Sequence, residues 1–150
     1  MATPTAPAPN EQATPARSDE LLGRLGTSII HTLLLQIVVG VANAEWLDVP
    51  ATGNAWTESK PMVLLMIHIL LGVALTVLGI WIAVLAFKAK SASWKVPSVI
   101  GIIGIIVGMG AGAGFMSANG DAGSTMAMTV GGVVAIGAYV VGLAKSSRQQ

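Results

Sequence analysis

The sequence predicts an all-α, polytopic membrane protein: a bundle of four transmembrane helices with both termini in the cytoplasm. Of the 150 residues, 53% are hydrophobic and only 10% are charged, against roughly 25% charged residues in a soluble domain. Four apolar segments cover residues 26–46, 61–87, 97–116 and 125–144. Each has about 20 residues or more, enough to cross a hydrocarbon core of about 30 Å as a helix. Their lack of two-residue alternation disfavours a β-barrel.

The distribution of basic residues predicts how the helices are oriented. Seven of the eight basic residues lie before the first span, between the second and third spans, or after the fourth: Arg17, Arg24, Lys88, Lys90, Lys95, Lys145 and Arg148. Only Lys60 lies in another connection, beside the acidic Glu45, Asp48 and Glu58. Because basic residues accumulate on the cytoplasmic side, we expect a multi-pass protein of the inner (plasma) membrane. Residues 1–25, rich in Ala and Pro, are expected to form a disordered cytoplasmic tail, and residues 145–150 a second tail.

Composition also limits the classes of function. The net charge is +1 and no basic patch with interleaved aromatic residues is present, so nucleic acid is not an expected partner. Absence of cysteine excludes disulfides, thiolate metal sites and cysteine nucleophiles. The apolar segments contain no paired carboxylates, phosphate-binding loop or zinc-ligand spacing. We therefore expect no independent enzyme. The tryptophans near the span ends, Trp46, Trp56, Trp81 and Trp94, are expected to lie at the membrane interface.

Small residues recur on one face of each later span. At about 100° per residue, the packing face of the second span contains His68, Gly72, Thr76, Gly79, Ala83 and Ala86. The third span presents Gly101, Gly104, Gly108 and Gly112, and the fourth Gly131, Ala135, Ala138 and Gly142. Small residues allow close helix packing in lipid. The alternative is that the glycines let a flat cofactor lie against the backbone.

His68 is the candidate site residue, because an ionisable side chain inside an apolar span is costly. Counting from the helix centres places Asn43, Glu45 and Met128 at its depth. A hydrogen bond to Asn43 is the structural interpretation. A Glu45–His68 pair could instead serve proton movement or pH sensing. Ligation of haem iron or Cu(I) by His68 and Met128 is the third interpretation.

The first span adds further polar residues, with Gln36 near the bilayer centre on the same face as Asn43. His31 lies on a different face and depth. The predicted offset between His31 and His68 is roughly 15–17 Å at about 1.5 Å per residue, too large for one iron. We therefore expect that these two histidines do not share a haem.

The segment His68-Ile-Leu-Leu-Gly72 within a four-helix unit resembles the half-bundles of haem A synthase and other small b-type cytochrome-like membrane proteins. The resemblance covers residues 26–144 at the level of topology. It implies haem b bound by histidines from two helices at one depth. The sequence departs from that pattern at Met128, where the second histidine would be expected.

Three functions follow as hypotheses. The first is an accessory or structural protein, as a subunit of a larger respiratory or transport complex or as a homo-oligomer. The second is an electron-transfer protein that binds haem b, or copper, through His68. The third is a small transporter or pore lined by Gln36, Asn43, Thr76 and His68.

Overall fold

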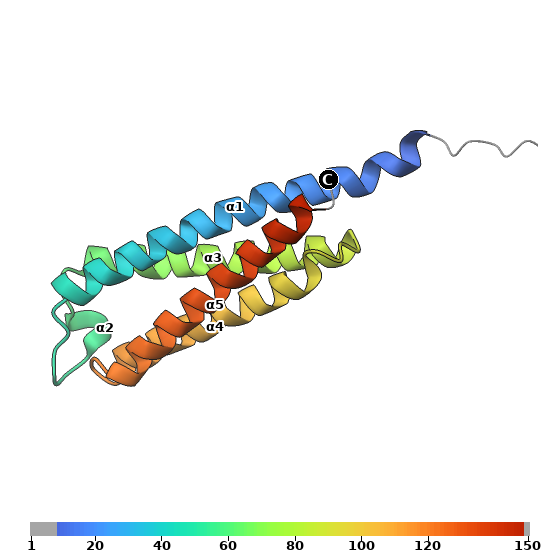
Figure 1. Cartoon of the computed structure of the whole chain (residues 1–150). Coiled ribbons are helices and arrows are strands. Elements are labelled where there is room, and N and C mark those ends of the chain that lie inside the picture. The colour runs from blue at the N-terminus through green and yellow to red at the C-terminus, as the bar shows by residue number, and fades with distance from the viewer. Residues whose placement is uncertain (1–8, 149–150) are drawn as a thin grey trace, which may run out of the picture.

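The computed structural model describes residues 9–148, with side chains from residue 17 onward, and contains five helices in this range (Figure 1). They are α1 (Pro9–Trp46), α2 (Ala55–Glu58), α3 (Met62–Lys88), α4 (Lys95–Ser117) and α5 (Ala122–Ser147). The short α2 lies in the α1–α3 connection. Each of the other four contains a segment long and apolar enough to cross a membrane. The predicted all-α bundle of four spans is confirmed.

The first long helix begins earlier than the sequence predicts. Residues 9–25 are helical rather than part of a disordered tail, and residues 1–8 of that predicted tail lie outside the described residues. Leu22 explains much of the difference, because its side chain is only 1% exposed and packs in the bundle core. Arg24 also donates a 2.7 Å hydrogen bond to Glu20 one turn earlier, a pairing that supports an exposed helix. Residues 9–25 and the apolar segment that follows them therefore form one continuous helix.

The four long helices form a ring in which neighbours are antiparallel. α1 packs against α3 and α5, and α4 packs against the same two helices, with α4 and α5 in the closest association. Figure 1 shows two hairpins, α1 with α3 and α4 with α5, that converge near the C-terminal end of α5 and diverge toward α2. We call these the Trp94 end and the α2 end of the bundle, because Trp94 precedes α4 at the first of them.

The main hydrophobic core lies toward the Trp94 end. It consists of Leu22, Ile29, Leu33, Leu75, Ile82, Ala86, Trp94, Ile105, Ala135 and Tyr139, from all four long helices and the α3–α4 connection. A smaller cluster of Ala55, Leu65 and Met116 packs under the loop that contains α2. The outer surfaces are apolar, with Val38 and Leu70 more than 60% exposed. Surfaces of this kind are suited to contact with lipid.

Trp94 is not the interfacial residue that its position in the sequence suggests. Its side chain is 0% exposed, whereas Trp46, Trp56 and Trp81 are 71%, 42% and 57% exposed. The Trp94 ring occupies the space where Gly26 of α1 and Gly142 of α5 would carry a Cβ atom. The prediction for Trp94 is wrong because glycines on two other helices create a place for the indole between them.

Glycines also determine how closely α4 approaches its neighbours. A Cβ atom on Gly104 would lie 2.6 Å from the carbonyl oxygen of Gly131, and the reciprocal distance from Gly131 to the Gly104 oxygen is also 2.6 Å. Tyr139 lies against Gly101, with its hydroxyl toward Gly79. These contacts place the two backbones of the α4–α5 hairpin together and insert an aromatic ring beside them.

Candidate functional site

The polar side chains of the apolar spans meet at the interface between α1 and α3. Gln36 of α1 and His68 of α3 lie with Gln36 Nε2 3.1 Å from His68 Nε2 and 3.1 Å from the His68 carbonyl oxygen. Both contacts are partly buried. The partner of His68 is therefore Gln36, and not Asn43 as predicted.

Each of these two side chains lies over a glycine of the opposite helix. A Cβ atom on Gly40 of α1 would lie 3.3 Å from His68 Cε1, and a Cβ atom on Gly72 of α3 would lie 3.6 Å from Gln36 Nε2. The arrangement is reciprocal because α1 and α3 run in opposite directions and Gln36 and His68 each precede their glycine by four residues. We call these four residues, Gln36, Gly40, His68 and Gly72, the α1–α3 clasp.

Asn43 contributes a second contact toward the α2 end. Its Nδ2 donates to the Val39 carbonyl oxygen at 3.1 Å and, more weakly, to the Leu64 carbonyl oxygen of α3 at 3.5 Å. Leu64 is one helical turn before His68. The amides of Asn43 and Gln36 therefore both donate to α3 carbonyl groups, as intramembrane amides commonly do between helices.

Several polar atoms of this interface have no hydrogen-bond partner among the described residues. They are Gln36 Oε1, Asn43 Oδ1 and His68 Nδ1, all of them buried. Buried polar groups normally have partners. The interface thus retains unused hydrogen-bonding capacity in addition to the bonds that connect the helices.

The other predicted polar residues do not contact the Gln36 or His68 side chains. Thr76 donates to the Gly72 carbonyl oxygen at 2.9 Å and contacts Met109 Sδ of α4 at 3.6 Å. Glu45 is exposed, so its assignment to the polar interior is wrong. His31 is also exposed, with Nδ1 2.8 Å from the Thr27 carbonyl oxygen. Because His31 lies nine residues before Gly40, its offset from His68 is about 13 Å, and the structure keeps the two histidines apart.

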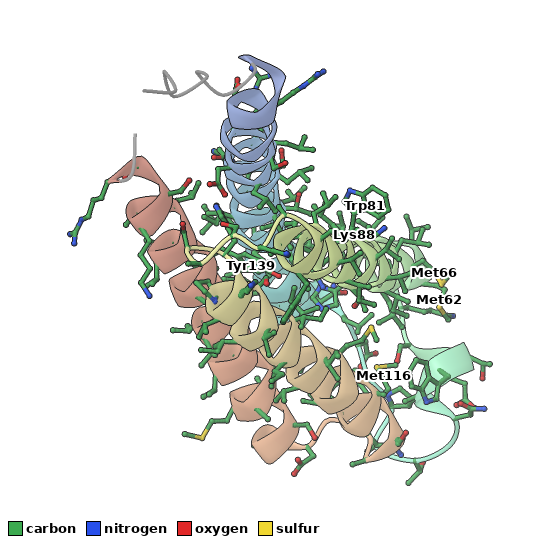
Figure 2. The ribbon with its side chains drawn as sticks, turned by 90° about the vertical axis from the view of Figure 1, so that its right-hand side faces the viewer. Met62, Met66, Trp81, Lys88, Met116 and Tyr139 are labelled. Carbon is green, nitrogen blue, oxygen red and sulfur yellow. The ribbon has the colours of Figure 1, made fainter. Side chains whose placement is uncertain are left out.

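Met128 does not face His68. A Cβ atom on Gly112 of α4 would lie 3.4 Å from Met128 Sδ, and one on Gly108 would lie 3.6 Å from the Met128 carbonyl oxygen. Met128 therefore packs within the α4–α5 hairpin, while His68 packs against α1. Met66 lies on the outer side of α3, away from the bundle interior where Tyr139 lies (Figure 2). Met62 is partly buried and packs against the smaller cluster of Ala55, Leu65 and Met116.

The fit of a haem or copper ion can be tested on these contacts. To bind haem iron or Cu(I), His68 would need a ring nitrogen directed at the metal. A second residue would also need to direct its ligand atom at the same metal. His68 Nε2 is directed at Gln36, its ring lies against Gly40, and the Met128 sulfur belongs to another interface. Among the described residues no group of three His, Cys, Asp or Glu side chains could hold a metal ion. In this arrangement His68 and Met128 do not fit a shared cofactor.

The clasp has a sequence signal that the prediction missed. Gln36-Ile-Val-Val-Gly40 and His68-Ile-Leu-Leu-Gly72 repeat one pattern: a polar residue, three aliphatic residues and a glycine. In an antiparallel pair of helices, this pattern allows each polar side chain to lie over the glycine of the other helix. Recognising the repeat would have paired Gln36 with His68 directly.

No family model, curated protein or solved structure matches the chain. The resemblance to haem A synthase half-bundles therefore depends on the four-helix topology and the His68–Gly72 spacing alone.

Proposed function

We propose that the protein is an accessory subunit of the inner (plasma) membrane that packs against another membrane protein, with both termini in the cytoplasm. The observation that carries the proposal is Gly137 on the outer face of α5. A Cβ atom on Gly137 would meet nothing within 4 Å. Val133 and Val141, one turn to either side, are 61% and 46% exposed. This glycine contributes no packing within the described chain.

A glycine at such a position has a cost. Glycine in a helix is less favourable than alanine by about 0.8–1.0 kcal/mol, and lipid chains do not require the close approach that glycine permits. A neighbouring transmembrane helix does benefit from it, because small residues let two backbones approach. The inward glycines, such as Gly104 and Gly131, already have this role within the bundle. Gly137 offers the same feature to a partner.

Charge supports the proposed orientation. At the Trp94 end, Lys88 is the last residue of α3, Lys90 lies in the α3–α4 connection and Lys95 is the first residue of α4. Lys145, in the last turn of α5, and Arg148, directly after α5, lie at the same end. By the positive-inside tendency, this end faces the cytoplasm.

The proposal is tested by extracting the full chain from its native membranes in a mild detergent and measuring the size of the complex that contains it. We expect an assembly larger than the monomer, from which Gly137→Leu is released while its thermal stability is retained. Val77→Leu is the matched control, because Val77 is 63% exposed on another helix, and it should remain in the assembly. A monomer in the unmodified membrane extract would contradict the proposal.

A visible spectrum of the purified protein separates the accessory role from electron transfer. The accessory role predicts no Soret band. A Soret band that disappears in His68→Ala would overturn it in favour of haem ligation.

A further inference from the structure

The hydrogen bonds of the clasp determine where His68 carries its proton. Gln36 Nε2 donates to the His68 carbonyl oxygen, which identifies this atom as the amide nitrogen rather than the amide oxygen. The same nitrogen lies 3.1 Å from His68 Nε2. Because an amide nitrogen donates and does not accept, His68 Nε2 must accept. The neutral imidazole therefore carries its proton on Nδ1.

We propose that the α1–α3 clasp is a proton-sensitive contact: protonation of His68 Nε2 breaks the Gln36–His68 pair and loosens α1 from α3. The step is a simple proton transfer from hydronium. One of its O–H bonds breaks and leaves water, the Nε2 lone pair forms an N–H bond, and the ring becomes an imidazolium. This inference does not depend on the accessory role proposed above, because it concerns contacts within one chain.

Protonation removes a hydrogen bond in either orientation of the Gln36 amide. If the amide stays as it is, two N–H donors face each other at the 3.1 Å Nε2–Nε2 contact. If it rotates, Oε1 can accept from the imidazolium but then faces the His68 carbonyl oxygen, also an acceptor. The two contacts of Gln36 can coexist only with a neutral His68.

No carboxylate is positioned to stabilise the imidazolium among the described residues. On α1 the nearest acid along the chain, Glu45, is exposed at the α2 end. The sequence of α3 contains no titratable residue between Met62 and Lys88 except His68, and α4 none after Lys95. On α5 the Tyr139 hydroxyl faces Gly79, about three turns from His68, and Lys145 is at the Trp94 end. The acids of the α2 loop, Asp48 and Glu58, are exposed. The charge would therefore be uncompensated, and separation of the helices with entry of water relieves it.

The test combines nitrogen NMR with a distance measurement in the full chain. His31→Gln leaves His68 as the only histidine, so ¹⁵N-histidine labelling reports on it alone. Because the chain has no cysteine, Val41→Cys and Ile67→Cys provide one spin label on α1 and one on α3, at positions that are 60% and 44% exposed. The label separation is measured by double electron–electron resonance over the pH range of the imidazole titration.

At high pH we expect protonated Nδ1 and unprotonated Nε2. As His68 becomes charged, the mean distance between the labels should increase by about 1–2 Å, a shift typical of helix movements, and its distribution should broaden. His68→Gln should show no pH-dependent change. Gln36→Glu should keep the short distance at low pH, because its carboxylate accepts from the imidazolium.

Three results would overturn the proposal. They are a proton on Nε2 at high pH, an imidazole that does not titrate, and a label separation that stays constant while His68 becomes charged.

Discussion

The Trp94 end of the bundle and the α1–α3 clasp solve one packing problem with different chemistry. In both, a large side chain lies over a glycine of a neighbouring helix. At the Trp94 end the large side chains are the aromatic Trp94 and Tyr139, both fully buried. Their polar atoms, Trp94 Nε1 and Tyr139 Oη, have no hydrogen-bond partner among the described residues. In the clasp they are Gln36 and His68, half-buried and hydrogen-bonded to each other.

This difference indicates which property each region depends on. In lipid, helix association relies on packing and interhelical hydrogen bonds rather than on a hydrophobic driving force. The aromatic region should tolerate loss of a polar atom but not loss of volume. The clasp should respond to a change in hydrogen-bonding capacity even where volume is kept.

The largest effect is expected for Trp94→Ala. Removal of the indole leaves a cavity between Gly26, Gly142 and the core, and such truncations cost about 3–5 kcal/mol. Trp46→Ala, at a 71% exposed position, is the matched control and should change the free energy of unfolding far less. Unfolding in mixed detergent micelles measures both. Equal losses in the two variants would show that Trp94 is not a core residue.

Gly131→Ala should be next. Its Cβ atom would lie 2.6 Å from the Gly104 carbonyl oxygen, and backbone cannot move away as a flexible side chain can, so we expect a loss of about 1–3 kcal/mol. Gly132→Ala is an ideal control, since its Cβ atom would meet nothing within 4 Å, and better helix propensity should make it neutral or stabilising by up to about 1 kcal/mol. The same unfolding assay applies. If both variants lose stability alike, the α4–α5 contact is not as close as described.

Tyr139→Phe should have a small effect of opposite sign. The Tyr139 hydroxyl is buried without a hydrogen-bond partner among the described residues, and such a group opposes folding. Its removal should leave stability unchanged or raise it by up to about 1 kcal/mol. A loss of more than about 1 kcal/mol would reveal a hydrogen bond that stabilises the aromatic region.

The smallest effect concerns Asp121, outside the spans, and serves to separate the pH response of the clasp from that of the loops. The backbone N–H of Ser124 donates to Asp121 Oδ2 at 2.8 Å. This hydrogen bond is the main reason that the pKa of this exposed carboxyl lies below its ordinary value of 3.8. The contribution to stability is thus present above pH 3.8 and is lost as the pH falls through the lower folded-state pKa. The variant Asp121→Asn keeps the helix cap. In thermal unfolding it should differ from the wild-type chain only by lacking the decrease in stability that protonation of Asp121 causes at acidic pH. A change near neutral pH would contradict the assignment.

The sequence predicts the four spans well because length and hydropathy are local properties. It places the start of the first helix too late, because burial of Leu22 depends on a core built by the other helices. Trp94 shows the same limit. Its position at a span end predicts an interfacial ring. The ring is buried instead, because Gly26 of α1 and Gly142 of α5 leave space for it between their helices.

The sequence predicts which residues belong to the candidate site but not which of them contact each other. The sequence identifies His68 and Gln36 as polar residues on packing faces. Their pairing depends on the register between α1 and α3. Counting residues from the helix centres predicts a register in which Asn43, rather than Gln36, lies at the depth of His68. The structure places Gly40 opposite His68 and pairs Asn43 with Leu64 instead. A long connection that contains α2 separates the two spans, so the turn between them does not fix their register.

The central claim, that Gln36 and His68 connect α1 and α3 through each other, is tested most directly by a double-mutant cycle. The free energy of unfolding would be measured for the wild-type chain, Gln36→Ala, His68→Ala and the double variant at a pH where His68 is neutral. The clasp predicts that the double variant loses less than the sum of the single losses, with a coupling of about 1 kcal/mol. Additive losses, within about 0.3 kcal/mol, would show that the two side chains act independently and would contradict the claim.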